Sequence, residues 1–374
     1  GLLCASIGKK GGAKGGDEQG SWEWNESLYE FVWRPDLALL VHGADGLVAQ
    51  ALPPTDAAWD DEPERVALAY LRRVAASFEA SPEKRERIVP LYRPLYDWLE
   101  ATVRATADQA AAENVPVEAF FSAEEEQALK DESLVVHRIG YHLEEILLGT
   151  TDPLSLLFKD DTVYRVYEKG PTFYQANQIL GQALDLLAHK HGQLRVLEIG
   201  AGTGGTTTHA LPVLGKRFVS YTFTDISPSF FEKAKAKFAP WGGRMKFQVL
   251  DIEKDLDAQG FTPESYDLIV ATDVLHATVD IVQTLTSVRR LLAPGGQLLM
   301  NEFVNTPMWI QTVFGTLSGW WRFQDPERRS VGPTLSEQAW RQAFVDSGWA
   351  VIHPLHDRRP RPIHATFLAT APLA

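Results

Sequence analysis

The sequence predicts an α/β protein in which a mostly parallel sheet follows a helical region. From about Gly192 onward, short apolar runs alternate with glycine-rich turns and helical patterns, which is typical of βα units. Between residues 51 and 149, apolar residues recur at spacings of three and four, which indicates amphipathic helices. A chain of 374 residues with 45% hydrophobic content is long enough for more than one domain.

The first 50 residues are predicted to be linker with one strand. Segment 11–20 is rich in glycine and polar, so it buries too little apolar surface to hold one conformation. We therefore expect residues 1–20 to be a flexible linker or the end of a preceding domain. Within the linker at 21–50, aromatic and branched residues alternate up to Pro35, as in a strand that ends at a turn.

Residues 51–185 are predicted to form an N-terminal helical lid, and residues 186–374 the sheet-containing core with C-terminal cap elements. Segments 63–80 and 91–113 show the clearest helical stripes, which favour a structural role because such stripes are usually core. The predicted parallel strands are 194–199, 219–224, 245–250, 266–272 and 296–304. Two later runs, 349–355 and 364–371, are expected to close the sheet edge after a helix at 336–348. The aromatic, glycine-broken segment 306–323 is expected to line a pocket or to pack on the sheet.

Composition excludes several functions. A net charge of −13 argues against binding nucleic acid or anionic membrane through bulk electrostatics. No run of about 18 apolar residues is present, so no membrane span is expected. The single cysteine, Cys4, excludes an internal disulfide and favours a reducing compartment, so we predict a cytoplasmic location. His189 and His191 lie two residues apart with no third ligand in view, and we expect no metal site.

The stretch VLEIGAGTGG, residues 196–205, indicates a ligand that lies against bare backbone. Gly200, Gly202 and Gly205 satisfy the dinucleotide fingerprint after a strand, which either NAD or another adenosyl ligand would fit. Glu198 interrupts the apolar strand just before the turn, where a buried strand would normally stay apolar. This acid suggests a ligand that carries an amino group.

Three further acids follow predicted strands. Asp225, Asp251 and Asp273 each come after a strand, and ligands of open α/β sheets bind at those carboxyl ends. Any one of them alone also fits a turn or a helix cap. Asp225, 20 residues past Gly205, is suited to the two ribose hydroxyls, and Asp251 to an adenine amino group.

Five motifs of the sequence occur in the same order and at a similar spacing as in one known family. VLEIGAGTGGTT, YTFTDIS, DIEKD, DVLHAT and LLAPGGQLLMNE are similar to the S-adenosylmethionine-dependent C-methyltransferase domain of fungal highly reducing polyketide synthases, including hybrids with nonribosomal peptide synthetases. The resemblance runs from about residue 152 to residue 348. The opening GLLCASIGK resembles the end of a dehydratase domain, and LYEFVWRPDL the linker that follows it. The resemblance implies a Rossmann-like class I methyltransferase core, with a seven-stranded, mostly parallel sheet, inside a megasynthase.

The resemblance also implies the site residues. The cofactor-binding residues it assigns are Glu198, Gly200, Ala201, Gly202, Gly204, Asp225, Ile226, Asp251, Ile252 and Asp273. Relatives often carry Asn at the position of Asp273, which leaves its contact with the donor open. His276 is implied as the base that removes the α-proton of a β-ketoacyl thioester, with Glu302 as its carboxylate partner. The implied partners are an acyl carrier protein with a phosphopantetheine-linked chain and the neighbouring dehydratase and ketoreductase domains.

Several aromatic residues have two interpretations. Tyr164, Tyr167 and Tyr174 are expected to cover the donor, with plain packing as the equal alternative. Trp309, Trp320 and Trp321 either wall an acyl tunnel or fill the core of the lid. Two other functions compete with α-C-methylation. A nicotinamide-dependent reductase fits the glycine turn but lacks a Tyr-x-x-x-Lys pair in the sheet region, and an inactive structural methyltransferase is the third hypothesis.

Overall fold

The computed structural model describes residues 3–9, 29–35, 62–107, 129–356 and 361–373. The predicted glycine-rich linker at 11–20 and the last part of the second predicted helix, 108–113, lie outside the described residues. Strand β1 (Leu3–Lys9) pairs with the predicted strand β2 (Tyr29–Pro35) in an antiparallel sheet of two.

The main sheet confirms the α/β prediction. Its seven strands have the order β5-β4-β3-β6-β7-β9-β8, and the first five are parallel. The two C-terminal strands close one edge as expected, because β9 runs antiparallel to β7 and β8 antiparallel to β9. The strands are β3 (Leu194–Ile199), β4 (Phe218–Asp225), β5 (Met245–Val249), β6 (Tyr266–Thr272), β7 (Leu292–Phe303), β8 (Val351–His356) and β9 (His364–Thr370).

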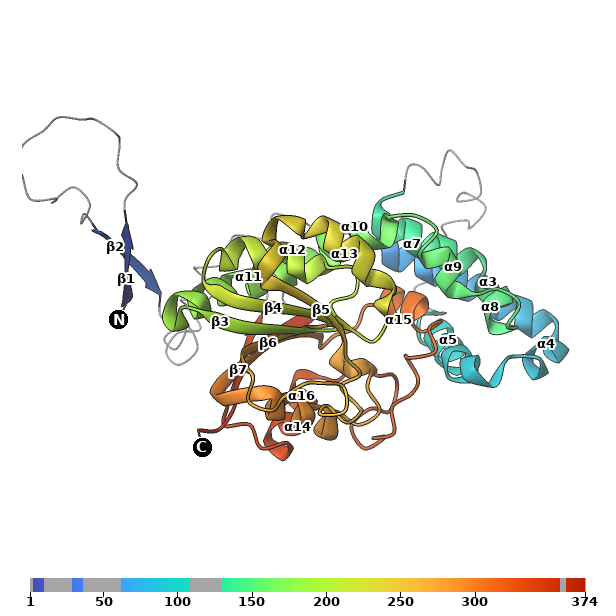
Figure 1. The fold of residues 1–374 in the computed structure, drawn as a ribbon. Coiled ribbons are helices and arrows are strands. Elements are labelled where there is room, and N and C mark those ends of the chain that lie inside the picture. Colours follow the sequence, from blue (N-terminus) through green and yellow to red (C-terminus); the bar gives the residue numbers. More distant parts are fainter. Residues whose placement is uncertain (1–2, 10–28, 36–61, 108–128, 357–360, 374) are drawn as a thin grey trace, which may run out of the picture.

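Helices cover both faces of this sheet (Figure 1). One face carries α11 (Pro171–His191), α12 (Gly205–Leu214) and α13 (Phe231–Lys237), and the other carries α14 (Ile281–Leu291) and the predicted helix α16 (Glu337–Asp346). Along β6, Leu268 and Val270 pack in the first layer, whereas Ile269 and Ala271 pack in the second. This alternation follows from the two-residue period of a strand, and it explains why the central strands are apolar throughout.

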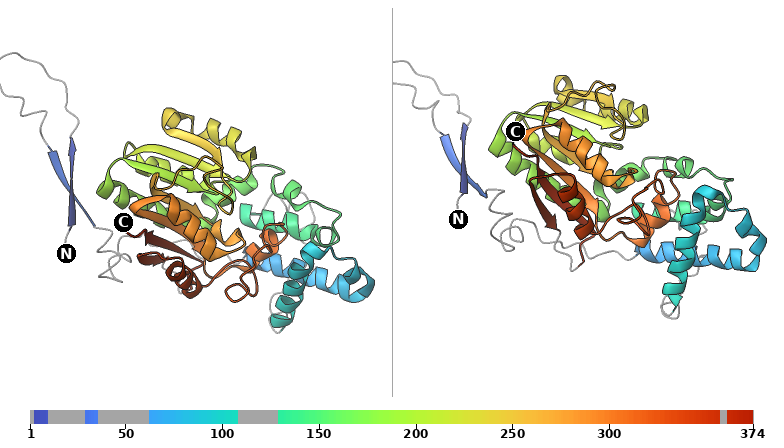
Figure 2. Two further views of the ribbon diagram at one scale, coloured as in Figure 1. Left: turned by 60° about the horizontal axis from the view of Figure 1, so that its bottom comes forward. Right: turned by 90° about the horizontal axis from the view of Figure 1, so that it is seen from below.

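The remaining helices gather beyond one end of the sheet, as both views of Figure 2 show. They are α3 (Glu62–Ala80), α4 (Pro82–Glu86), α5 (Arg93–Ala105), α7 (Asp131–Tyr141), α8 (Leu143–Leu147), α9 (Pro153–Leu157) and α10 (Thr162–Lys169). Within the described residues the second predicted helix corresponds to α5, which ends at Ala105, and the Thr106 hydroxyl donates to the Thr102 carbonyl. Among the helices described, none combines the length and apolar character needed to cross a bilayer.

The aromatic segment 306–323 joins this helical layer. Its short helix α15 (Met308–Phe314) is buried and packs against α3 and α7, while Phe314 also faces a cavity. Helix α11 connects both layers, because Phe173 near its start belongs to the helical cluster and its later residues pack on the sheet.

A close approach of α3 and α7 depends on Gly140. A Cβ atom built there would lie 2.4 Å from the ring of Tyr70, which is fully buried and bonded through its hydroxyl to His137 Nδ1 at 2.7 Å. We predict that Gly140→Ala lowers the free energy of unfolding by about 1–3 kcal/mol through overpacking. Urea unfolding measures this change.

Gly181→Ala in α11 is the matched control. Its Cβ would contact only Val213 Cγ2, at 3.9 Å, so the variant should be neutral or stabilised by up to about 1 kcal/mol through better helix propensity. Equal effects of the two substitutions would contradict the close approach.

Candidate functional site

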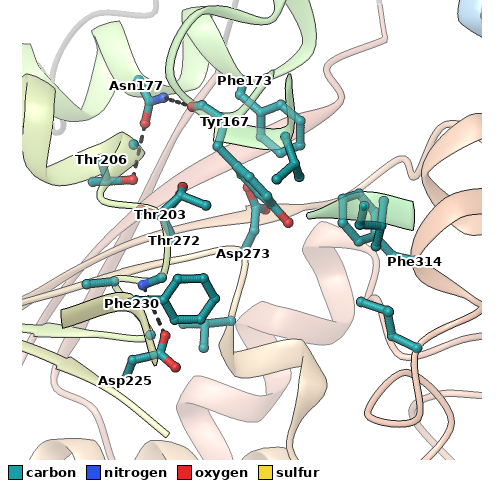
Figure 3. Close-up of a pocket in the computed structure, with 18 of the residues that line it drawn as sticks. Tyr167, Phe173, Asn177, Thr203, Thr206, Asp225, Phe230, Thr272, Asp273 and Phe314 are labelled. Carbon is teal, nitrogen blue, oxygen red and sulfur yellow. Dashed lines mark hydrogen bonds between the residues drawn. The ribbon is translucent and has the colours of Figure 1, made fainter. Parts of the chain in front are cut away.

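A cavity of about 300 Å³ opens at the carboxyl ends of the parallel strands, where the helical layer covers them (Figure 3). The glycine turn and the strand ends contribute Gly200, Ala201, Gly202, Thr203, Asp225, Thr272, Asp273 and Asn301. Helices contribute Leu154, Leu157, Val163, Tyr167, Phe173, Asn177 and Phe314. Polar groups at the strand ends therefore face a mostly apolar wall of helical residues, which is the usual character of a small-molecule site.

The glycine turn after β3 has a positive φ at three positions: 63° at Gly200, 50° at Gly202 and 73° at Gly204. The reasons for glycine differ. A Cβ at Gly200 would collide with Val274, and one at Gly204 with the Phe238 ring. At Gly202 the nearest atom would be 3.8 Å away, so this glycine leaves the backbone open to the cavity. Gly204 itself is not among the described residues that line the cavity.

Glu198 lies in β3 and is buried, outside the cavity lining. Its Oε2 accepts hydrogen bonds from the hydroxyls of Tyr221, at 2.6 Å, and Thr207. Burial raises the pKa of this carboxyl to about 7, with Asp225 adding to the effect and the two hydroxyls opposing it. A cation bound nearby would relieve this unfavourable environment.

Asp225 ends β4 and faces the cavity. Its carboxylate accepts the backbone amides of Gly202 at 3.0 Å and Ser227 at 2.8 Å, and burial raises its pKa. Neighbouring Ile226 is 59% exposed.

Asp251 and Ile252 follow β5, next to the end of β4 that carries Asp225. The Asp251 carboxylate lies 3.1 Å from the Lys254 ammonium, and Ile252 is buried with the apolar cluster under the sheet. Neither is among the described residues that line the cavity.

Asp273 follows β6 with φ of 49°, a left-handed conformation that Asp adopts more readily than most residues. His364 Nε2 lies 3.2 Å from its Oδ2. Its Oδ1 and the Thr272 hydroxyl are buried at the cavity without a hydrogen-bond partner in the described part of the chain. Buried polar atoms normally have partners, so these two fit a polar ligand.

His276 and Glu302 come together from different strands. His276 lies in a single helical turn (Leu275–Ala277) after β6, and Glu302 lies near the end of β7. The imidazole Nδ1 is 2.6 Å from Glu302 Oε2, and both side chains are buried. Glu302 Oε1 also accepts the backbone amides of Val274 and Leu275, at 3.1 and 2.8 Å.

This contact selects one tautomer of the imidazole. A carboxylate only accepts hydrogen bonds, so Nδ1 carries the proton and Nε2 is left as a base. Burial by itself lowers the pKa of His276, but the Glu302 carboxylate outweighs that effect, and the net pKa is raised.

The other aromatic candidates divide by location. Tyr167 lines the cavity, and burial raises the pKa of its phenol. Tyr164 lies under the Lys233 ammonium and Tyr174 is 45% exposed. The tryptophans pack in the helical layer: Trp320 contacts the His276 ring at 5.3 Å between centroids, Trp309 packs against Phe173, and the Trp321 indole donates to Gly315 O.

Several lining residues have no local motif in the sequence. Asn177 donates to Tyr167 O and accepts from the Thr206 hydroxyl, which joins α11 to the glycine turn (Figure 3). Asn177 lies within the predicted helical lid, and its role follows only from these contacts. Phe230 and Asn301 reach the cavity only through the fold. Within the described ranges, no three His, Cys, Asp or Glu side chains are grouped to hold a metal ion.

Known proteins match this chain in sequence. A family described as "Methyltransferase domain" matches residues 197–298. A highly reducing polyketide synthase of Aspergillus terreus is 35% identical over 94% of this chain and 14% of its own length. Squalestatin tetraketide synthase of a Phoma species is 33% identical over 87% of this chain and 13% of its own length. The chain therefore spans roughly one seventh of these relatives.

Solved structures match over nearly their whole length. The CurJ carbon methyltransferase has a TM-score of 0.72 at 28% identity, covering 83% of this chain and 92% of that one. The trans-methyltransferase CalH, solved in complex with SAH, has a TM-score of 0.72 at 26% identity, covering 93% and 97%.

The raised pKa of Glu198 has a consequence for stability. In the unfolded chain this carboxyl has its ordinary pKa of 4.5, whereas burial in the fold raises the pKa to about 7. Ionisation therefore lowers the free energy of unfolding as the pH rises through this window, by up to about 3 kcal/mol.

We predict that Glu198→Gln removes this contribution, because an amide does not ionise and still accepts a hydroxyl hydrogen bond. Urea unfolding at pH 5 and pH 8 should show the variant gaining stability over the parent at the higher pH. Glu232→Gln, at an exposed side chain on α13, is the control and should show no such trend. A stability difference for Glu198→Gln that is the same at both pH values would refute the prediction.

Proposed function

The chain belongs to the S-adenosylmethionine-dependent C-methyltransferase domains of fungal highly reducing polyketide synthases or of their hybrids with nonribosomal peptide synthetases, and on this premise we propose that it methylates the α-carbon of a β-ketoacyl thioester, with His276 as the base. The observation that carries this proposal is the buried contact of 2.6 Å between His276 Nδ1 and Glu302 Oε2.

The residues at the cavity fit the donor. S-adenosylmethionine, when bound, supplies a methyl group on a positively charged sulfur. We propose that the open backbone at Gly202 accommodates it, that Asp225 holds its ribose, and that the unpartnered Oδ1 of Asp273 faces its cationic part. Glu198, buried just before the turn, favours the same positive charge.

The step that side chains of this chain are proposed to perform is a proton transfer. The α-carbon of a β-ketoacyl thioester is acidified by two flanking carbonyls, and His276 Nε2 is the proposed acceptor of its proton. Glu302 keeps the proton on Nδ1 and stabilises the imidazolium that forms. His276 does not itself line the cavity, although Asp273 and Val274 do, so the proposal requires the substrate to open a path to the imidazole.

The proposed substrate is carried on the phosphopantetheine of an acyl carrier protein. The relatives that the chain matches are multidomain synthases, which supports this proposal. Neighbouring dehydratase and ketoreductase domains are proposed partners on the same ground.

We predict that the chain methylates a β-ketoacyl thioester and leaves the β-hydroxyacyl and saturated counterparts unmodified, because only the first has an α-proton acidified by two carbonyls. Intact-mass measurement of small thioester mimics, incubated with the chain and S-adenosylmethionine, detects the gain of one methyl group. Equal methylation of the reduced thioesters would refute the enolate route. Donor binding without methylation of any thioester would instead indicate an inactive structural methyltransferase.

We predict that His276→Ala reduces methyl transfer by about 10²- to 10⁴-fold, the range for loss of a positioned general base, with donor affinity unchanged. Glu302→Gln should also be impaired for a geometric reason. Its single carboxamide oxygen is drawn to the amides of Val274 and Leu275, which turns the NH₂ group toward His276 Nδ1. The imidazole proton then moves to Nε2, which is the wrong tautomer for a base.

Single-turnover rates measure the loss of methyl transfer, and titration with S-adenosylmethionine measures the donor affinity. The double variant should be little slower than His276→Ala alone, because Glu302 has no catalytic task without the imidazole. Strictly multiplicative losses would mean that Glu302 acts independently of His276.

A further inference from the structure

We propose that Arg329 is a positioning residue for His276, a buried guanidinium that fixes the backbone of the turn on which the imidazole is carried. The inference rests on the proposed role of His276 as the base. Arg329 lies in the loop between α15 and α16, outside the motifs singled out in the sequence, and it is only 1% exposed.

The guanidinium binds the turn at three carbonyl oxygens. Its Nη1 donates to His276 O and Thr278 O, each at 2.8 Å, and its Nη2 donates to Val279 O at 2.8 Å. These carbonyls belong to His276 itself and to the second and third residues after it. Glu302 holds the same turn from the other side, through the amides of Val274 and Leu275. The main chain that carries His276 is therefore tied both before and after the residue.

The side chain of Arg329 is itself held in place by Asp325. Its Nε donates to Asp325 Oδ1, and Asp325 Oδ2 accepts the backbone amide of Ile281 at 3.3 Å. The Gln324 amide donates to Val279 O at 2.9 Å. The loop and the turn are thus joined by a buried ion pair and by backbone contacts.

The chemistry of these contacts requires arginine. The guanidinium presents five N–H donors in a rigid plane, which serves several carbonyls and a carboxylate at once. A lysine keeps the charge, but its compact ammonium has only three donors and does not reproduce this fork. Substitution of Arg329 by lysine therefore separates the effect of its positive charge from the effect of its donor geometry.

Arg329 also acts on the titration of His276. Two acidic groups raise the pKa of the imidazole: Glu302 from β7, which contacts it, and Asp273 after the end of β6. The Arg329 charge is the cation that opposes them. Because a base must be unprotonated, this opposition keeps the imidazole available at a lower pH than the acids alone would allow.

Two variants of the full chain test the proposal. Arg329→Lys retains the charge and loses the fork, so methyl transfer should fall by roughly 10-fold or more, with donor affinity within about twofold and the pH midpoint of the rate unchanged. Arg329→Gln also loses the charge, so the pH midpoint should rise. Nuclear magnetic resonance of ¹⁵N-labelled histidine in the ligand-free protein measures the pKa and the tautomer of His276 directly, independently of turnover.

Arg195→Lys is the matched control. Arg195 pairs with Asp267 through two hydrogen bonds at the start of β3, the end of the strand opposite the cavity, so this variant should keep the rate and the pH midpoint.

The outcomes distinguish the two proposals. Suppose that His276→Ala is inactive, so that the role of His276 stands. A parental rate for Arg329→Lys together with an unchanged pKa of His276 in Arg329→Gln would then overturn only the role of Arg329. Loss of activity in step with loss of donor affinity or melting temperature would also overturn it, because Arg329 would then be only structural. If Arg329→Gln fails to fold, the rate and donor affinity of Arg329→Lys decide. Full activity of His276→Ala would refute the role of His276 as the base, and the role of Arg329 that rests on it.

Discussion

The buried carboxylate of Glu302 holds together the part of the molecule on which the chemistry depends. One oxygen accepts backbone amides of the turn after β6, and the other accepts the imidazole N–H of His276. A carboxylate with no exposure costs several kcal/mol to bury unless its lone pairs are filled, and here both oxygens are occupied. Because Glu302 lies in β7 and the turn follows β6, the pairing of these two strands sets the position and the tautomer of the imidazole.

The titratable groups at the cavity are acidic. Asp225 and Asp273 line it, Glu198 is buried just outside its lining, and burial raises the pKa of Glu198 and Asp225. The positive charge of Arg329 is committed to Asp325 and to three carbonyls behind the imidazole. These acidic groups favour a cation at the cavity, which accords with a donor that carries a sulfonium and an amino group.

The helical layer completes the site that the sheet begins. The sheet supplies polar groups at its carboxyl ends, whereas Leu154, Leu157 and Phe173 supply apolar walls. Asn177 couples the two parts, since it bonds both the backbone of α10 and the first turn of α12. An apolar wall opposite buried acids lowers the local dielectric, which strengthens every charge interaction in the cavity.

The sequence by itself determined the features that leave a local pattern. All seven strands of the main sheet, the two that close its edge among them, and the glycine turn were predictable, because side-chain periodicity and turn chemistry are properties of neighbouring residues. Asp225 and Asp273 were predictable at the carboxyl edge, since the ends of parallel strands share one edge. The family resemblance added His276 and Glu302, 26 positions apart.

Tertiary structure alone decided what these residues face. Asp225 turns into the cavity while Asp251 pairs with Lys254, and Gly202 opens to the cavity while Gly200 and Gly204 are closed by neighbouring side chains. The roles of Asn177, His364 and Arg329 come from contacts across 29, 91 and 53 positions respectively. Such contacts have no signature in the sequence, because they depend on how the loops and helices pack around the sheet and not on the order of adjacent residues.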